Sequence, residues 1–229
     1  MTRVKICGIT RESDLQAAVD AGADAVGIVC DVPIETPREV SVDRATALVD
    51  AAPPFVTTVL VTMPTGPERA IELAEAVDPD VIQLHGGMRP GDLAYLRAKI
   101  DASVFLAIDA EDVSEAGLYD DIADALVVDS ADEHGAGGTG ETHDWERTRA
   151  AIDPLESPVI LAGGLTPSNV TEAIETVSPF AVDASSGIEA EHQPGTKDHE
   201  SVRAFVDAAR RPDGVTSESR PREQPTVER

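Results

Sequence analysis

The residues whose types most clearly suit ligand binding follow two short apolar runs near the C-terminus, at 159–161 and 180–182. Gly163-Gly164 comes after the first run and Ser186-Gly187 after the second. Backbone N–H groups of such small residues can approach a ligand closely. Where two adjacent parallel strands both end in turns of this kind, their amides converge and can stabilise a phosphate dianion without any lysine. We therefore predict a phosphate site at these two turns.

Reactive side chains also follow earlier apolar runs. Period-two alternation through Lys5-Ile6-Cys7 places Lys5 and Cys7 on the same, inward side of a strand. Asp129 directly follows the apolar run 125–128, a position where an ordinary solvent-exposed charged residue is not expected. A lone cysteine is usually only a small buried residue, and an aspartate there could instead cap a loop or pair with a cation. The glycine after Cys7 and its strand-end position favour a functional role.

Four further polar residues have ligand-binding potential. Gln83 and His85 end another apolar run and supply a neutral donor and an imidazole. Asp183 follows the run 180–182 and can accept a hydrogen bond from a sugar hydroxyl. Arg38 is a surface cation by default, but it could clamp a carboxylate bidentately.

The apolar runs that position these residues read as strands and recur about every 20 to 30 residues, with amphipathic segments between them. The predicted strands are 4–9, 25–29, 55–61, 81–84, 104–107, 125–129, 159–161 and 180–182. Eight strands alternating with eight helices predict a (β/α)8 barrel, in which active sites lie at the C-terminal strand ends and phosphate sites after the last two strands. An open doubly wound sheet ranks second, because no dinucleotide glycine fingerprint follows the first strand.

The helix starts and the domain limits follow from local signals. N-caps are predicted at Ser13, Asp43 and Ser168, and Pro167 suits the first turn of its helix. Residues 1–210 form the predicted barrel domain. The remaining 211–229 are charged, contain three prolines and have few apolar residues, so we expect a disordered tail.

The charge balance excludes several classes of partner. The chain has 43 Asp+Glu against 18 Lys+Arg, a formal net charge of −25. Such a polyanion repels nucleic acid and anionic membranes, and the acids are spread along the chain rather than gathered into a metal site. We interpret them as the solvated shell of a protein from a salt-rich cytosol, where screening removes the self-repulsion. We expect no nucleic-acid partner, no membrane partner and no metal.

Compartment, redox state and assembly are less constrained. No apolar run is long enough for a membrane span and no signal-peptide pattern is present, so we expect a cytoplasmic protein. Cys7 and Cys30 are too few for a disulfide framework, although a pairing between them stays open. We expect a monomer or a weak homodimer that acts on a small molecule.

A series of short sequence motifs, or words, runs along residues 3 to about 210 in a fixed order. They are Val-Lys-Ile-Cys-Gly-Ile-Thr (4–10), Gly-Ala-Asp-Ala-Val-Gly (22–27), Val-Ile-Gln-Leu-His-Gly (81–86), Gly-Gly-Thr-Gly (137–140) with Asp144-Trp145, Leu-Ala-Gly-Gly-Leu-Thr-Pro-Ser-Asn-Val (161–170), Val-Asp-Ala-Ser-Ser-Gly-Ile-Glu (182–189) and Pro-Gly-Thr-Lys-Asp (194–198). Each word is weak alone, but in this order they closely resemble the phosphoribosylanthranilate isomerase family of tryptophan biosynthesis.

The resemblance implies a cofactor-free Amadori rearrangement of N-(5-phosphoribosyl)anthranilate to 1-(2-carboxyphenylamino)-1-deoxyribulose 5-phosphate. It implies that Cys7 is the general base, Asp129 the general acid and Arg38 the partner of the anthranilate carboxylate. The residues that it assigns to the phosphate are Gly140, Gly163, Gly164, Ser186 and Gly187. An unperturbed thiol has a pKa of about 8.5 and is mostly protonated at neutral pH, so we expect Lys5 to favour the thiolate of Cys7.

Two departures from the family pattern bear on the predicted site. The segment 30–38, which ends at Arg38, lacks the usual aromatics and the Ser-x-Arg approach. Glu141 stands where a lysine is common, so phosphate neutralisation depends more on amides. Only 3% of residues are aromatic, which predicts looser packing around the anthranilate ring.

Three other functions compete with this interpretation. A metal-dependent sugar-phosphate epimerase needs histidine and carboxylate ligands on several strand ends, and apart from His85 the chain does not offer them. The related histidine-pathway isomerase has aspartate where Cys7 stands. A catalytically silent phosphoribosyl-ligand binder would keep the glycine turns and lose the chemistry, and the presence of both Cys7 and Asp129 argues against it.

Overall fold

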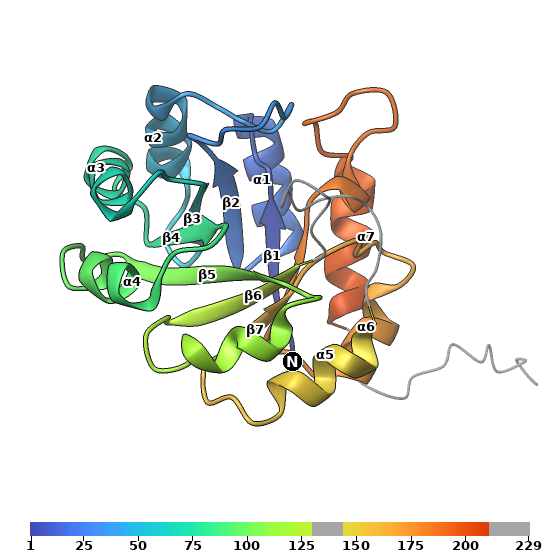
Figure 1. The fold of residues 1–229 in the computed structure, drawn as a ribbon. Coiled ribbons are helices and arrows are strands. Elements are labelled where there is room, and N and C mark those ends of the chain that lie inside the picture. Colours follow the sequence, from blue (N-terminus) through green and yellow to red (C-terminus); the bar gives the residue numbers. More distant parts are fainter. Residues whose placement is uncertain (130–143, 211–229) are drawn as a thin grey trace, which may run out of the picture.

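Eight parallel strands close into a barrel, and the helices cover its outside (Figure 1). This computed structural model describes residues 1–129 and 144–210. The strands are β1 (Arg3–Cys7), β2 (Ala25–Val29), β3 (Thr57–Thr62), β4 (Val81–His85), β5 (Ser103–Asp109), β6 (Ala125–Asp129), β7 (Val159–Leu161) and β8 (Ala181–Ala184). Each pairs in parallel with the next and β8 pairs with β1. The predicted barrel is confirmed, and the open sheet is excluded.

The helices alternate with the strands, with one exception. They are α1 (Glu12–Ala21), α2 (Val42–Ala51), α3 (Pro67–Val77), α4 (Pro90–Arg97), α5 (Trp145–Ile152), α6 (Val170–Val177) and α7 (His199–Ala209). Between β5 and β6 the expected α-helix is instead a 3-10 helix, η1 (Val113–Leu118), and a second, η2 (Ser186–Ile188), follows β8. Ser114 and Gly117 give the η1 segment weak α-helix propensity. No helix within the two described ranges is long and apolar enough to cross a membrane.

The predicted N-caps Ser13, Asp43 and Ser168 are each wrong by one or two residues. Helices α1, α2 and α6 begin after Arg11, Ser41 and Asn169. Pro167 therefore lies before α6, not in its first turn.

Alternation along the strands separates two kinds of core. Outward-facing residues such as Ile6, Ile28 and Leu60 pack in a large cluster with the helices. Inward-facing residues such as Val59, Val127 and Ile160 fill the barrel in smaller clusters. This is the period-two arrangement that a closed barrel requires. At the C-terminal strand ends the inward positions become reactive or polar, and the members of this set are Cys7, Gln83, His85, Asp129 and Asp183.

Candidate active site

One pocket at the C-terminal end of the barrel brings together every predicted site residue except Gly140, which lies outside the described residues. The predicted residues that line it are Cys7, Arg38, Gln83, His85, Asp129, Gly163, Gly164, Asp183, Ser186 and Gly187. The pocket has a volume of about 780 Å³, including the part open to solvent. Within the described residues no group of three or more histidine, cysteine, aspartate or glutamate side chains could hold a metal ion.

The Cys7 thiol ends β1 and is nearly buried in the pocket wall. Gly27 pairs with it on β2, and a Cβ at Gly27 would lie only 2.7 Å from Sγ, so glycine there leaves room for the thiol. Burial raises the pKa of Cys7, Lys5 and Lys197 oppose the rise, and Asp183 adds to it. Cys7 and Cys30 are both free thiols.

Lys5 does not act on Cys7 as an isolated cation. Its Nζ lies 2.7 Å from Oδ2 of Asp183, its register partner on β8, and both side chains are buried. Burial lowers the pKa of Lys5, but Asp183 and Cys7 together raise it above its ordinary value, so the amine stays charged. Lys5 is the strongest of the groups that oppose the rise in the Cys7 pKa, which agrees with the prediction that it favours the thiolate, and the Asp183 carboxylate beside it offsets part of that effect. Asp183 Oδ1 accepts no hydrogen bond from the described residues, which leaves it available to a ligand hydroxyl.

Arg38 enters the pocket from the loop that follows β2, which contains bends and a turn. Alternate side chains of this segment, Val32, Ile34, Thr36 and Arg38, line the pocket, whereas the intervening 33, 35 and 37 are exposed. The guanidinium forms a fork with Glu189, with Nε 2.7 Å from Oε1 and Nη2 3.3 Å from Oε2. The fork uses one edge of the guanidinium, so the Nη1 side can still meet a second carboxylate.

The two glycine turns pack against each other. Gly163 and Gly164 have φ values of 85° and 61°, in the left-handed region that favours glycine. A Cβ at Gly187 would lie 2.2 Å from the carbonyl oxygen of Leu165, so the turn after β8 needs glycine to approach the turn after β7. No described residue accepts a hydrogen bond from the N–H of Gly163 or Gly164. These amides are therefore available to an anion.

The start of α6 lies farther from these turns than expected. Asn169 joins them, since its Nδ2 donates to the carbonyl oxygen of Gly164 at 3.0 Å and its Oδ1 accepts from the N–H of Thr166 at 2.8 Å. The helix therefore begins beyond Pro167, and the side chain of Asn169 braces the turn after β7.

Strands β4 and β6 carry the other polar groups of the pocket. Gln83 is buried, and its Oε1 has no hydrogen-bond donor among the described residues. His85 and Asp129 end β4 and β6 and line the same pocket. Strands β7 and β8 lie between β6 and β1, so Asp129 and Cys7 project from different parts of the wall. The rest of the described lining is largely apolar and contains no aromatic residue: Val29, Val61, Met63, Ala162 and Leu165.

Sequence reasoning missed two charged residues behind the pocket, Glu189 and Lys197. Lys197 Nζ donates to the carbonyl oxygen of Ser185 at 3.0 Å and to Glu189 Oε1 at 3.2 Å. Its side chain has no exposed surface. One signal for it was present, because lysine occurs only at Lys5, Lys99 and Lys197 in this acidic chain.

Comparison with known proteins places this pocket in context. The model of the N-(5'-phosphoribosyl)anthranilate isomerase family matches residues 4–208. A relative with that name from Halobacterium salinarum is 60% identical over 209 residues, which cover 90% of this chain and 94% of the relative. The crystal structure of phosphoribosyl anthranilate isomerase from Thermotoga maritima is similar, with a TM-score of 0.80, 36% identity, and coverage of 91% of this chain and 98% of that one. A structure of such an enzyme with reduced 1-(o-carboxyphenylamino)-1-deoxyribulose 5-phosphate has a TM-score of 0.78 and 34% identity, with coverage of 91% and 98%.

Proposed function

This chain belongs to the phosphoribosylanthranilate isomerase family, and we propose that it catalyses that isomerisation with Asp129 as general acid and Cys7 as general base. It is then an enzyme of tryptophan biosynthesis that converts N-(5-phosphoribosyl)anthranilate to 1-(2-carboxyphenylamino)-1-deoxyribulose 5-phosphate. The observation that carries the assignment is the single pocket in which a thiol, a carboxyl group and two glycine turns meet. The reaction needs each of these groups.

Binding positions the substrate between the two reactive side chains. The amides of the Gly163-Gly164 and Ser186-Gly187 turns hold the phosphate, and no lysine is among the described residues that line the pocket. Arg38 uses the guanidinium edge that Glu189 leaves open to meet the anthranilate carboxylate. The apolar lining then contacts the aromatic ring, and Asp183 Oδ1 and Gln83 Oε1 accept hydrogen bonds from the sugar.

Catalysis moves one proton to the ring oxygen and another from carbon. Asp129 gives its proton to the ribose ring oxygen, the bond from that oxygen to C1 breaks, and the anthranilate nitrogen supplies the electron pair that forms the iminium. The Cys7 thiolate then removes the proton from C2, and the resulting enolamine tautomerises to the C2 ketone. No electrons leave the substrate, so the step needs no redox partner.

Arg38→Ala should raise KM about 10- to 100-fold while kcat changes less, because charge-assisted hydrogen bonds contribute about 1.5–3 kcal/mol. Steady-state kinetics over a substrate titration measure both constants. Arg97→Ala is the matched control, since Arg97 pairs with Asp124 at the other end of the barrel. A product analogue without the ring carboxylate should bind Arg38→Ala and wild type equally. A large loss of affinity for that analogue would contradict the assignment.

Direct assay of the purified protein tests the function. Turnover of phosphoribosylanthranilate at molar KCl and restored tryptophan-independent growth of a salt-tolerant host lacking the isomerase are the expected results. Affinity for the substrate without turnover would instead support the silent phosphoribosyl-ligand binder.

The assembly state stays a prediction. We propose a monomer or a weak homodimer, whereas the Thermotoga maritima enzyme is described as dimeric. The division of the chain at residue 210 also stays a prediction, because 211–229 lie outside the described residues. Cytoplasmic location stays a prediction as well.

Salt should stabilise this protein. A net charge of −25 makes the compact state repel itself, and dissolved ions screen that repulsion over about 3 Å at 1 M. The urea midpoint of unfolding should therefore rise steadily from low to molar KCl. This expectation agrees with the source of a 60% identical relative, the haloarchaeon Halobacterium salinarum. A flat dependence on KCl would count against an acidic shell adapted to salt.

A further inference from the structure

Lys197 is a buried cation behind the reactive thiol. A Cβ at Gly8, the residue after Cys7, would lie 3.2 Å from Lys197 Nζ, so the amine lies directly against the end of β1. Gly8 has a φ of 77°, which both ends the strand and leaves space for the ammonium group. The other contacts of Nζ are the carbonyl oxygen of Ser185 and the carboxylate of Glu189.

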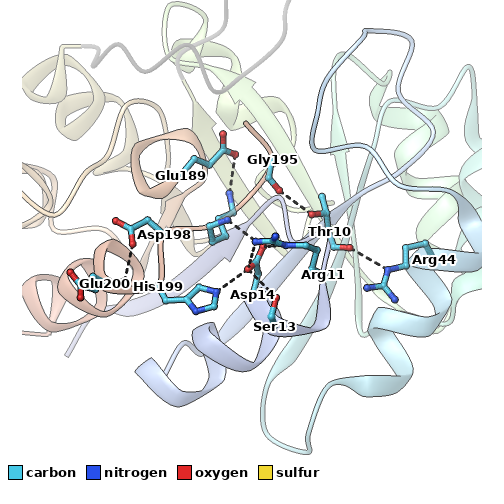
Figure 2. A network of polar contacts seen from close by, with 11 residues as sticks. Thr10, Arg11, Ser13, Asp14, Arg44, Glu189, Gly195, Asp198, His199 and Glu200 are labelled. Atoms are coloured by element: carbon cyan, nitrogen blue, oxygen red, sulfur yellow. Dashed lines mark hydrogen bonds and ion pairs between the residues drawn. The ribbon is translucent and has the colours of Figure 1, made fainter. Parts of the chain in front are cut away.

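A second network fixes the backbone at Lys197. The N–H of Lys197 donates to Oδ2 of Asp14 at 3.2 Å, and Asp14 on α1 has no exposed surface. Arg11 and His199 contact the same carboxylate, with Nη2 and Nε2 at 3.0 and 2.9 Å from Oδ1 (Figure 2). Burial raises the pKa of Asp14, but these hydrogen bonds together lower it below its usual range. The first turn of α7 and the start of α1 thus hold Lys197 in place.

The charges around Cys7 do not cancel. Lys5 and Asp183 form one neutral pair beside the thiol. Lys197 and Arg38 share the single carboxylate of Glu189, so that group carries one net positive charge. Across the pocket, His85 and Asp129 face the same space, and Asp129 carries its proton at the start of the proposed reaction.

We propose that Lys197 is a positioning residue that stabilises the thiolate of Cys7, with Glu189 setting the strength of its effect. The inference rests on the proposed role of Cys7 as base, but its effect on the thiol exists without turnover. Burial lowers the pKa of Lys197 below its ordinary value with a smaller contribution from Arg38, while Glu189 and Cys7 oppose the fall. The Glu189 carboxylate therefore favours the charged amine and partly offsets its charge. The bond to Ser185 also links the amine to the residue before the phosphate-binding turn.

The test is the pKa of Cys7 in Lys197→Met, read from the ultraviolet absorbance of the thiolate during a pH titration. Subtracting the same titration of a Cys7→Ser counterpart isolates Cys7 from Cys30. Loss of one nearby positive charge should raise the Cys7 pKa by about 1–3 units. The rising limb of kcat/KM against pH should shift to higher pH by the same number of units, since turnover needs the thiolate. Lys197→Arg should restore most of both shifts.

One further variant tests the sign of the shift in the Cys7 pKa, and another is a control. Glu189→Gln removes the carboxylate but keeps its shape, so the Cys7 pKa should fall, opposite to Lys197→Met. This variant also tests the proposal if Lys197→Met fails to fold. Lys99→Met, at the surface C-terminal to α4, is the matched control and should leave the pKa unchanged. An unchanged Cys7 pKa in folded Lys197→Met, or a rise in Glu189→Gln, would overturn the proposal. If both pKa shifts appear without turnover in wild type, the thiolate inference stands and the proposed function fails.

Discussion

Replacing Cys7 with serine should lower kcat by about 10²- to 10⁴-fold and leave KM near the wild-type value. A serine hydroxyl ionises far above neutral pH, so it cannot remove the C2 proton at a useful rate. Its oxygen is smaller than sulfur and fits the space that Gly27 leaves, so the pocket should keep its shape. Steady-state kinetics at molar KCl measure both constants, and equal losses in kcat and kcat/KM would locate the defect in the transition state.

Cys30→Ser is the matched control for this experiment. Cys30 is also a buried free thiol, but it does not line the pocket, so its replacement should change kcat little. Near-normal turnover in Cys7→Ser, with activity still dependent on the pocket residue Asp129, would show that another group is the base.

The barrel could be predicted because its strands carry strong local signals. The runs 25–29, 125–129 and 159–161 agree with the observed strands at both ends. The misplaced ends have backbone causes that composition does not show. Gly8 turns the chain away after Cys7, and Phe55, counted as apolar strand, lies fully exposed with a φ of 73°. A hydrophobic side chain predicts burial only on average, so a run of apolar letters cannot by itself locate the end of a strand.

The pocket residues could be predicted for a related reason. A barrel places its C-terminal strand ends in one region, so residue type and strand position together identify Cys7, Gln83 and Asp129 as neighbours. The ionic partners of charged residues at the site could not be identified from the sequence. Lys5, for example, pairs with Asp183, which lies 178 positions away in the chain. Arg38 shows the same limit, since the fork with Glu189 joins two loops separated by 151 positions. Alternation within 32–38 could have placed Arg38 in the pocket, but not its partner.

Asp129→Asn should lower kcat by about 10²- to 10⁴-fold, because an amide cannot transfer a proton to the ribose ring oxygen. The amide is nearly the same size as the carboxyl group, so substrate should still bind and KM should change less. In the proposed sequence ring opening precedes proton removal by Cys7. The double variant Cys7→Ser/Asp129→Asn should therefore lose much less than the product of the single losses, as residues acting in one reaction do.

Asp109→Asn provides a matched control at the next strand end. Asp109 is the register partner of Asp129 on β5, but it is not among the residues that line the active-site pocket. It lines a neighbouring pocket that Asp129 also borders, and its Oδ1 accepts from the N–H of Glu111 at 2.9 Å. If Asp129 acted only as a local negative charge, Asp109→Asn would remove a like charge from the same edge of the barrel, and both variants would be weakened alike. A general acid predicts a large loss in kcat for Asp129→Asn alone. Equal losses in the two variants would refute proton transfer from Asp129 and leave only the local negative charge as the cause.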